Sequence, residues 1–313
     1  MINEKIEKSF NLIDTPISKI GKIAFINSFC LGDNLIGLIT AYNLYRNGYD
    51  VDVFGDFSYY MKDWFPWANI MPSVKPENVG VLSNYSTVVF MYENEYKAIK
   101  YPQQNFIILS KSSFYKAPIS MVDVQVNVCK NELHLENVVR ENGLVPLANL
   151  AHRKNKNRIV IHSTSSLERK NWPKKKFLQL AKTLLAKGYE PNFILTAKER
   201  NDWLEVVDAG AKIPEFISLS EVAAFIYESQ YFIGNDSGIG HLASNLGIPT
   251  ITIVLRKGVA RQWRPSWSLG EIVLPPPWLI TRPLKEKFWK KLISVAKVLR
   301  KFEILIKKDN ERK

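Results

Sequence analysis

Residues 231–247 contain the side chains and spacings of this sequence that best suit chemistry. An apolar run at 231–233 ends in small and polar residues, and apolar residues at helical spacing follow at once. Between the two, Ser237, Gly238 and Gly240 leave backbone N–H groups uncovered. Because a helix N-terminus carries a partial positive charge and unpaired donors, it can bind a phosphate. The pattern therefore predicts a protein that handles a phosphorylated or nucleotide ligand.

A second segment, residues 162–174, also joins a predicted strand to a predicted helix. Ser165 and Ser166 can donate hydroxyl hydrogen bonds to phosphate oxygens, and Lys170 can supply positive charge. An ordinary loop with a surface lysine has a similar composition, so this segment is a weak signal by itself.

A third segment, residues 27–37, places Asp33 where a predicted strand turns into a predicted helix. One interpretation is that Asp33 caps this helix, which is a common role of aspartate. The other is a carboxylate that is available as a general base. The residues alone favour the capping role.

Two series of alternating strands and helices position these segments. The predicted strands cover residues 22–28, 51–54, 87–91, 106–109, 158–162, 192–196, a short stretch near Phe216, and 249–254. The predicted helices cover residues 35–45, 131–142, 173–187, 199–209 and 220–228, and Gly48 and Gly188 end the first and third. Two such series imply an α/β fold of two doubly wound domains with a cleft between them. The polar, basic segment 146–157 marks the boundary, so we predict domains at 1–150 and 151–313.

Composition narrows the class of protein. The chain has 313 residues, 46% of them hydrophobic, which is enough for two cores. Two cysteines, Cys30 and Cys129, make neither a disulfide framework nor a zinc site, which favours a reducing compartment. The N-terminus lacks the apolar core of a signal peptide, and we expect no membrane span.

The net charge of +13 suggests a nucleic acid, an anionic membrane surface or an acidic substrate as partner. The basic residues do not form one patch interleaved with aromatic residues, which argues against nucleic acid. Residues 288–302 form a basic amphipathic pattern near the C-terminus. We favour a helix packed on the protein body over a helix that lies on a membrane.

Taken together, the three segments resemble glycosyltransferase family 9, the ADP-heptose–lipopolysaccharide heptosyltransferases. Gly32-Asp33 resembles the family's N-terminal Gly-Asp turn. Ser165-Ser166 and the run Lys170-Asn171-Trp172-Pro173 resemble its phosphate loop. Asp236-Ser237-Gly238, followed by His241 and by Gly247-x-Pro249, resembles its Asp-Thr/Ser-Gly-x-x-His signature. The order and spacing of all three segments fit, so the resemblance spans most of the chain.

The resemblance implies a GT-B fold, with two Rossmann-like domains, and an inverting transfer of a heptose or related sugar. The acceptor would be a lipopolysaccharide core or similar glycan, bound by the N-terminal domain. Asp33 would be the general base for its hydroxyl. The residues expected to bind the donor are Ser165, Ser166, Lys170, Glu199, Asp236, Ser237, Gly238 and His241.

Several of these roles have a structural alternative. Asp236 would repel a diphosphate, so we expect it to cap the helix or to bind sugar hydroxyls. Glu199 matches the family's position for a ribose contact, but a glutamate at a helix start also stabilises the helix dipole. His241 points at the donor in one interpretation and packs in the core in the other.

The resemblance implies ADP-heptose as the nucleotide diphosphate sugar, and we expect no further cofactor. We also expect no metal in the donor site, because Lys170 and the helix end supply positive charge. Asp50-Val51-Asp52 spells the Asp-x-Asp of metal-dependent glycosyltransferases, but a structural role at a strand edge is favoured. The implied location is cytoplasmic, with peripheral attachment to the inner face of the inner membrane. The alternatives are a nucleotide-sugar epimerase of GT-B architecture and a non-catalytic nucleotide-sugar binding protein.

Overall fold

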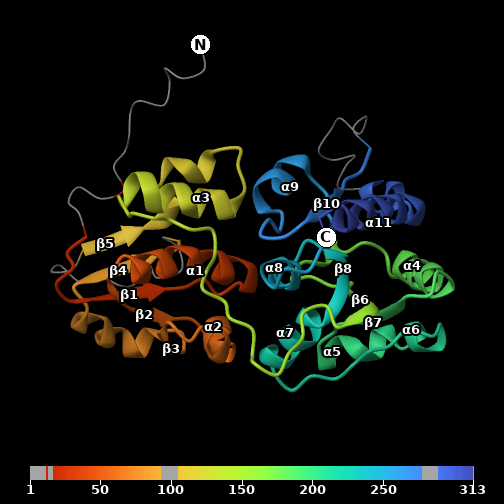
Figure 1. Ribbon diagram of the computed structural model, residues 1–313, viewed down its shortest axis with the longest axis horizontal. Helices are drawn as coiled ribbons and strands as arrows, with labels where there is room; N and C mark the ends of the chain where they lie inside the picture. Colours follow the sequence, from red (N-terminus) through yellow and green to blue (C-terminus); the bar gives the residue numbers. More distant parts are fainter. Residues whose placement is uncertain (1–11, 13–16, 93–104, 277–287, 313) are drawn as a thin grey trace, which may run out of the picture. The chain divides into compact units, whose positions relative to one another are not determined.

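The computed structural model describes residues 12, 17–92, 105–276 and 288–312. The chain divides into two compact units, Met1–Val145 and Pro146–Lys313, each with its own parallel sheet (Figure 1). The division falls at the start of the polar segment 146–157. In the described part of the chain, no helix combines the length and the apolarity that crossing a bilayer requires.

Unit 1 is built on five parallel strands in the order β3-β2-β1-β4-β5. The strands are β1 (Lys22–Ile26), β2 (Asp50–Phe54), β3 (Asn69–Met71), β4 (Thr87–Phe90) and β5 (Asn105–Ile108). Four of them match predicted strands, and β3 is too short to give a pattern. The strand order reverses between β1 and β4. In open parallel sheets, ligands bind outside the carboxyl ends of the strands at such a point.

Helix α1 (Leu31–Arg46) leaves the carboxyl end of β1, and Gly48, with φ of 83°, follows its end as predicted. The shorter helices are α2 (Asp56–Tyr60) and α3 (Met121–Asn127), and α3 continues as a π-helix over Val128–Glu132. The first turn of α1 therefore lies at the switch point of the unit 1 sheet.

The helix predicted over residues 131–142 is wrong, because the chain after Glu132 runs without helix to the end of unit 1. Side-chain amides at the C-terminal end of α1, from Asn43 and from the C-cap residue Asn47, hold this segment instead. Asn47 donates to the carbonyl of Glu136 at 3.0 Å and accepts from its N–H at 2.8 Å. Asn43 forms the same pair of bonds with Val139, at 2.9 and 2.8 Å. These tertiary bonds satisfy backbone groups that a helix would pair internally.

Unit 2 has five parallel strands in the order β10-β9-β8-β6-β7. They are β6 (Asn155–His162), β7 (Glu190–Phe193), β8 (Ser229–Asn235), β9 (Thr250–Ile253) and β10 (Gly270–Val273). The switch point lies between β6 and β8. These strands approach closely at Gly234, where a Cβ atom would lie 2.8 Å from the carbonyl oxygen of His162.

The long helices of unit 2 are close to their predictions, and the short elements are not. The helices are α4 (Lys174–Ala186), α5 (Ala197–Arg200), α6 (Glu205–Asp208), α7 (Leu219–Tyr227), α8 (Gly238–Asn245), α9 (Lys257–Trp263) and α11 (Val295–Asn310). The single helix predicted over 199–209 is divided into α5, a 3-10 turn and α6. No strand forms at Phe216; the nearest pairing is an isolated bridge between Asn192 and Lys212.

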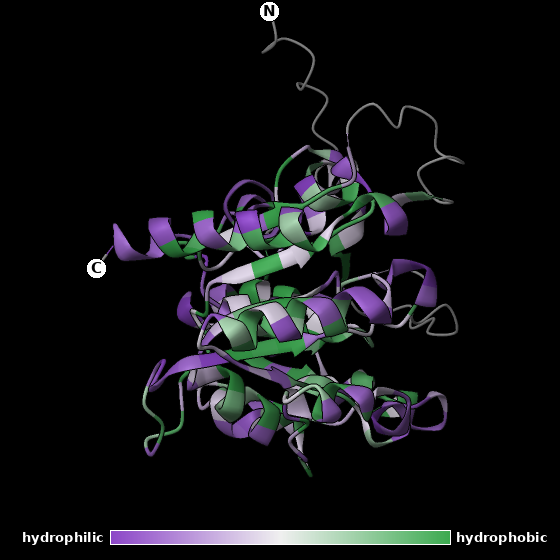
Figure 2. Cartoon of the chain, turned by 90° about the vertical axis from the view of Figure 1, so that its right-hand side faces the viewer, coloured by the Kyte–Doolittle hydropathy of each residue, from purple (hydrophilic) through white to green (hydrophobic). Residues whose placement is uncertain are grey.

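Helix α11 packs on the body of unit 2, which was the favoured interpretation of the basic C-terminal pattern. It contacts β9, β10 and α4. Its apolar face is buried through Val295, Val298, Phe302 and Leu305, and hydrophilic residues alternate with them along the helix (Figure 2). The helical pattern is interrupted at Ile293 and Ser294, so α11 starts at Val295 rather than at residue 288. Because the apolar face is covered by protein, this face is not free for a membrane.

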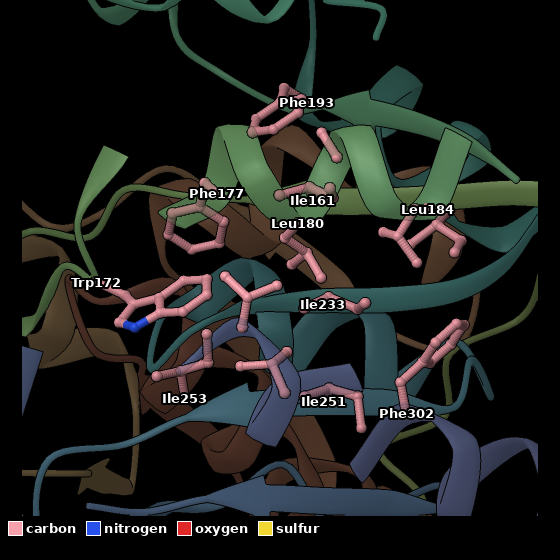
Figure 3. Packing of buried hydrophobic residues seen from close by; sticks show 14 of the residues in the cluster. Ile161, Trp172, Phe177, Leu180, Leu184, Phe193, Ile233, Ile251, Ile253 and Phe302 are labelled. Atoms are coloured by element: carbon pink, nitrogen blue, oxygen red, sulfur yellow. The ribbon is translucent and has the colours of Figure 1, made fainter. Parts of the chain in front are cut away.

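The core of unit 2 reaches the end of the loop that precedes α4. Trp172, from that loop, packs with Phe177 and Leu180 of α4 and with strand residues such as Ile233 and Ile253 (Figure 3). Trp172 is 1% exposed, and its ring lies edge-on to Phe177 with ring centres 5.0 Å apart. The sheet core thus fixes the C-terminal end of this loop.

Candidate functional site

The predicted phosphate segments of unit 2, 66 residues apart in the sequence between Lys170 and Asp236, meet at the switch point of its sheet. Strands β6 and β8 pair in parallel, with His162 opposite Gly234. Their carboxyl ends therefore lie at the same edge, where the β6–α4 loop and the β8–α8 turn emerge. The Nζ atom of Lys170 lies 3.1 Å from the Oδ2 atom of Asp236.

Three consecutive residues, beginning with the last residue of β8, contact the end of β6 or the loop that follows it. The Asn235 side chain donates to the carbonyl of Ser163 at 2.7 Å and accepts from the N–H of Trp172 at 3.0 Å. Asp236 pairs with Lys170, as described above. Ser237 Oγ lies 3.1 Å from Nδ1 of His162, the last residue of β6. The signature turn and the loop thus form one connected structure.

Helix α8 begins without a side-chain cap. Ser237 occupies the N-cap position with extended backbone, but its hydroxyl bonds to His162 rather than to the first turn of the helix. Gly238, the first helical residue, adds no side chain over the backbone. The amide groups at this helix start are therefore not satisfied by a side chain, which suits them to an anionic ligand. Asp236 precedes the N-cap and is not the cap itself.

The two predicted serines of the loop have different environments. The Ser165 hydroxyl lies 3.0 Å from the carbonyl of Leu167 and 2.6 Å from Oδ1 of Asn171, so it takes part in the internal structure of the loop. Ser166 is exposed. Ser166 is therefore the more accessible of the two hydroxyl groups.

Glu199 has the structural role that was weighed against a ribose contact. Its Oε2 atom accepts from both the N–H and the hydroxyl of Thr196 at 2.8 Å, in a capping box at the start of α5. Burial acts to raise the pKa of Glu199, but hydrogen bonds from Thr196 and Thr164 outweigh burial and lower this pKa. Thr164 belongs to the β6–α4 loop, so the carboxylate also lies beside that loop.

His241 is buried beside the same turn, with 5% of its surface exposed. Burial lowers its pKa to about 4, although the Asp236 carboxylate and the backbone carbonyl of Trp263 favour the charged form. Its Nδ1 atom has no hydrogen-bond partner within the described residues. His241 is therefore a neutral imidazole at pH 7, with one ring nitrogen left over for a hydrogen bond.

Asp33 lies in unit 1, in the first turn of α1 and at the switch point of that sheet. It does not occupy the N-cap position, which belongs to Cys30, and it is half-buried. Burial raises the pKa of the Tyr115 phenol, and the negative charge of Asp33 acts in the same direction. A half-buried carboxylate at the carboxyl edge of a parallel sheet is well placed to meet a ligand.

The Asp-x-Asp sequence has a structural role. Asp52 is buried and accepts from the Tyr85 hydroxyl at 2.7 Å and from Asn69 at 2.9 Å, while Lys22 lies 3.4 Å away. Lys22 also lies 3.6 Å from Asp50. Among the described residues, no three His, Cys, Asp or Glu side chains gather in a way that could hold a metal ion.

The sequence reasoning missed the role of Asn235. An asparagine at the end of a predicted buried strand, directly before Asp-Ser-Gly, was the available signal, because buried polar side chains need hydrogen-bond partners. The identity of these partners could not be read from the sequence.

Comparison with known proteins places the segments 162–174 and 231–247 in a family context. A family model described as glycosyltransferase family 9 (heptosyltransferase) matches residues 75–257. Lipopolysaccharide heptosyltransferase 1 of Campylobacter coli is 38% identical over 109 residues, which is 32% of this chain and 32% of that protein. The match thus spans about a third of this curated relative.

Solved structures share the fold over almost the whole chain. E. coli heptosyltransferase WaaC with ADP has a TM-score of 0.69 at 13% identity, covering 91% of this chain and 99% of that one. The glycosyl transferase family 9 structure from Veillonella parvula DSM 2008 has a TM-score of 0.71 at 15% identity, covering 94% and 99%. At these identities the likeness concerns the fold, and it confirms the prediction of a GT-B type with two α/β domains.

Proposed function

This protein belongs to glycosyltransferase family 9, and from that premise we propose that it transfers a heptose or related sugar from a nucleotide diphosphate sugar to a lipopolysaccharide core or similar glycan. The observation that carries the proposal is the junction of Lys170 and the uncapped start of α8 at one switch point. A cation and a helix start without a side-chain cap together suit a diphosphate. The ADP named with the E. coli structure makes ADP-heptose the donor that we propose.

The donor diphosphate lies, in this proposal, between the loop and the helix start. Lys170 and Ser166 approach it from the loop, and the amides of Ser237 and Gly238 approach it from α8. Ser165 supports the loop from within and reorients its hydroxyl when the donor binds. Lys170 would then exchange part of its contact with Asp236 for the diphosphate.

The sugar and the ribose lie at either side of the diphosphate. Asp236, relieved of part of its ion pair, accepts hydrogen bonds from sugar hydroxyl groups. His241 offers a neutral ring nitrogen rather than a charge. Glu199 keeps its capping bonds and offers its remaining acceptor capacity to the ribose hydroxyls.

The reaction is a single displacement at the anomeric carbon. The acceptor hydroxyl oxygen forms the new bond to that carbon while its proton passes to the Asp33 carboxylate. The bond between the anomeric carbon and the diphosphate oxygen breaks, and ADP leaves with the electron pair. Because the diphosphate is a weak base, it needs positive potential but no general acid. Attack from the opposite face inverts the configuration, and we propose that no metal ion takes part.

The net charge of +13 supports an anionic acceptor at a membrane surface. Because the apolar face of α11 is buried in unit 2, we propose that attachment to the inner face of the inner membrane is electrostatic and that no helix inserts. The protein itself is then cytoplasmic and peripheral.

The proposal is tested with Asp33→Asn, which preserves the shape of the side chain but removes its basicity. We expect turnover of ADP-heptose to fall roughly 10²- to 10⁴-fold, the usual contribution of a general base, with unchanged ADP affinity. Asp50→Asn is the matched control, because Asp50 lies at the amino end of β2 and is exposed; this variant should keep full turnover. Unchanged turnover in Asp33→Asn would remove Asp33 from the mechanism, and no ADP binding by the wild type would refute the proposed donor.

A further inference from the structure

Asn235 connects both ends of the β6–α4 loop, and its side chain is completely buried. Its Nδ2 donates to the carbonyl of Ser163 at 2.7 Å, where the loop leaves β6. Its Oδ1 accepts from the N–H of Trp172 at 3.0 Å, where the loop enters α4. One amide therefore closes a loop of about ten residues with two buried hydrogen bonds.

The end of the loop at Trp172 is itself fixed to the core of unit 2. The indole N–H of Trp172 donates to the carbonyl of Ile293 at 3.0 Å, and the ring is packed against Phe177. Asn235 thus joins the carboxyl end of β8 to a residue that is anchored in the core of unit 2. The part of the loop that remains exposed, around Ser166 and Lys170, is held at its two ends.

The residues after Asn235 carry the other half of the candidate site. Asp236 pairs with Lys170 at 3.1 Å, and Ser237 starts α8. The position of Asn235 relative to the loop therefore sets the distance between the loop cation and the helix start. A diphosphate bridging the two depends on that distance, because charge-assisted hydrogen bonds weaken steeply outside their normal range.

We propose that Asn235 is a positioning residue for the donor site: it sets the loop that bears Lys170 against the start of α8 without touching the donor. This inference rests on the proposed function only for the identity of the ligand. An asparagine suits the position because one planar group supplies both a donor and an acceptor. Aspartate would keep the acceptor for Trp172 but lose the donor to Ser163.

The test compares Asn235→Ala with Asn43→Ala. Asn43 is also fully buried and bridges backbone groups, donating to Ile39 and Val139 and accepting from Val139. It belongs to unit 1, whereas the loop belongs to unit 2, so it controls for the loss of a buried amide. We expect Asn235→Ala to weaken ADP binding roughly tenfold to hundredfold, the range for loss of a supporting group, while Asn43→Ala binds ADP like the wild type.

A double-mutant cycle with Lys170→Met identifies how Asn235 acts. If Asn235 works by placing Lys170, adding Asn235→Ala to Lys170→Met weakens ADP binding by much less than it does in the wild type. The proposal would be overturned if Asn235→Ala weakened ADP binding by the same factor with and without Lys170→Met. It would also be overturned if Asn235→Ala bound ADP as tightly as the wild type. Both measurements are made at a temperature where circular dichroism shows each variant to be folded.

Hydrogen exchange provides a readout that needs no nucleotide. The amides of residues 163–172 should exchange faster in Asn235→Ala than in Asn43→Ala, because the two ends of the loop are released. Unchanged exchange would overturn the positioning role. If the loop exchanges faster in Asn235→Ala but the wild type does not bind ADP, the positioning role of Asn235 stands and the proposed donor is refuted.

Discussion

The buried imidazole of His241 makes a quantitative prediction about pH. Burial lowers the pKa of His241 to about 4, from an ordinary value of 6.5. The unfolded chain therefore takes up a proton at a higher pH than the folded chain does, so the folded state loses stability as the pH falls from about 6.5 towards 4. Between about pH 7.5 and about pH 5, these two pKa values give a loss of about 2 kcal/mol from this one side chain.

His241→Gln removes the titrating group and keeps an amide that can donate a hydrogen bond. We measure the free energy of unfolding in urea at both pH values for each protein. The decrease from about pH 7.5 to about pH 5 should be about 2 kcal/mol smaller in the variant than in the wild type. Because each protein is compared with itself at two pH values, the cost of the substitution at neutral pH cancels. The change should appear in the unfolding transition of unit 2.

The same pKa is measured directly by NMR titration of labelled histidine. The chain has four histidines, so the signals are few, and His→Gln variants assign them. His162, whose pKa burial also lowers to about 4, should titrate with His241 far below the ordinary range. A His241 signal that titrates near 6.5, or equal acid sensitivity of wild type and His241→Gln, would refute the reasoning and would restore a charged imidazole as a partner for phosphate.

The remaining predictions concern the donor site, the metal, the membrane and the fold. Lys170→Met should weaken ADP binding roughly tenfold to hundredfold, since a hydrogen bond to a charged group contributes about 1.5–3 kcal/mol; calorimetry that finds no change would exclude Lys170 from the site. Turnover should persist in excess chelator, and a loss that Mg²⁺ restores would contradict the metal-free mechanism. Anionic vesicles should bind the protein at low salt and release it at high salt, because exposed charges are screened; binding that is independent of salt, or absent, would oppose electrostatic attachment. Asp309→Ala leaves the bidentate partner Arg153 buried and unpaired and should cost about 3–5 kcal/mol of stability, whereas the control Glu303→Ala, in the exposed pair with Lys187, should cost under about 1 kcal/mol.

The predicted strands and long helices were mostly correct because their signals are local. Buried parallel strands appear as short apolar runs, as at β4 and β9, and glycines at Gly48 and Gly188 follow the helices that they were expected to end, with φ of 83° in both cases. Periodicity failed at 131–142, where amides of α1 bind the backbone of a non-helical segment. No local pattern reveals such partners, since they lie about 90 residues earlier in the chain.

The candidate site shows the same division at the level of single residues. The types of Ser166, Lys170 and Ser237 could be read as phosphate chemistry, but the contacts that bring the two segments together could not. Asp236 was expected to cap α8 or bind sugar; the structure pairs it with Lys170 and gives the N-cap to Ser237. Glu199 closes a capping box with Thr196 at the start of α5, and the Thr-x-x-Glu spacing was the signal for it in the sequence.

The sequence by itself determined the residue chemistry, the rhythm of strands and helices and the family, because these depend on neighbours along the chain. Only the tertiary structure decided the strand order of unit 2, in which β8 is the neighbour of β6. This order brings Lys170 against Asp236 and lets Asn235 accept a hydrogen bond from Trp172 at the end of the loop. The physical reason is that parallel pairing brings together strands that are distant in the sequence, and no local pattern identifies the partner of a strand. Once the strands are paired, the buried polar groups at their ends must form hydrogen bonds with one another.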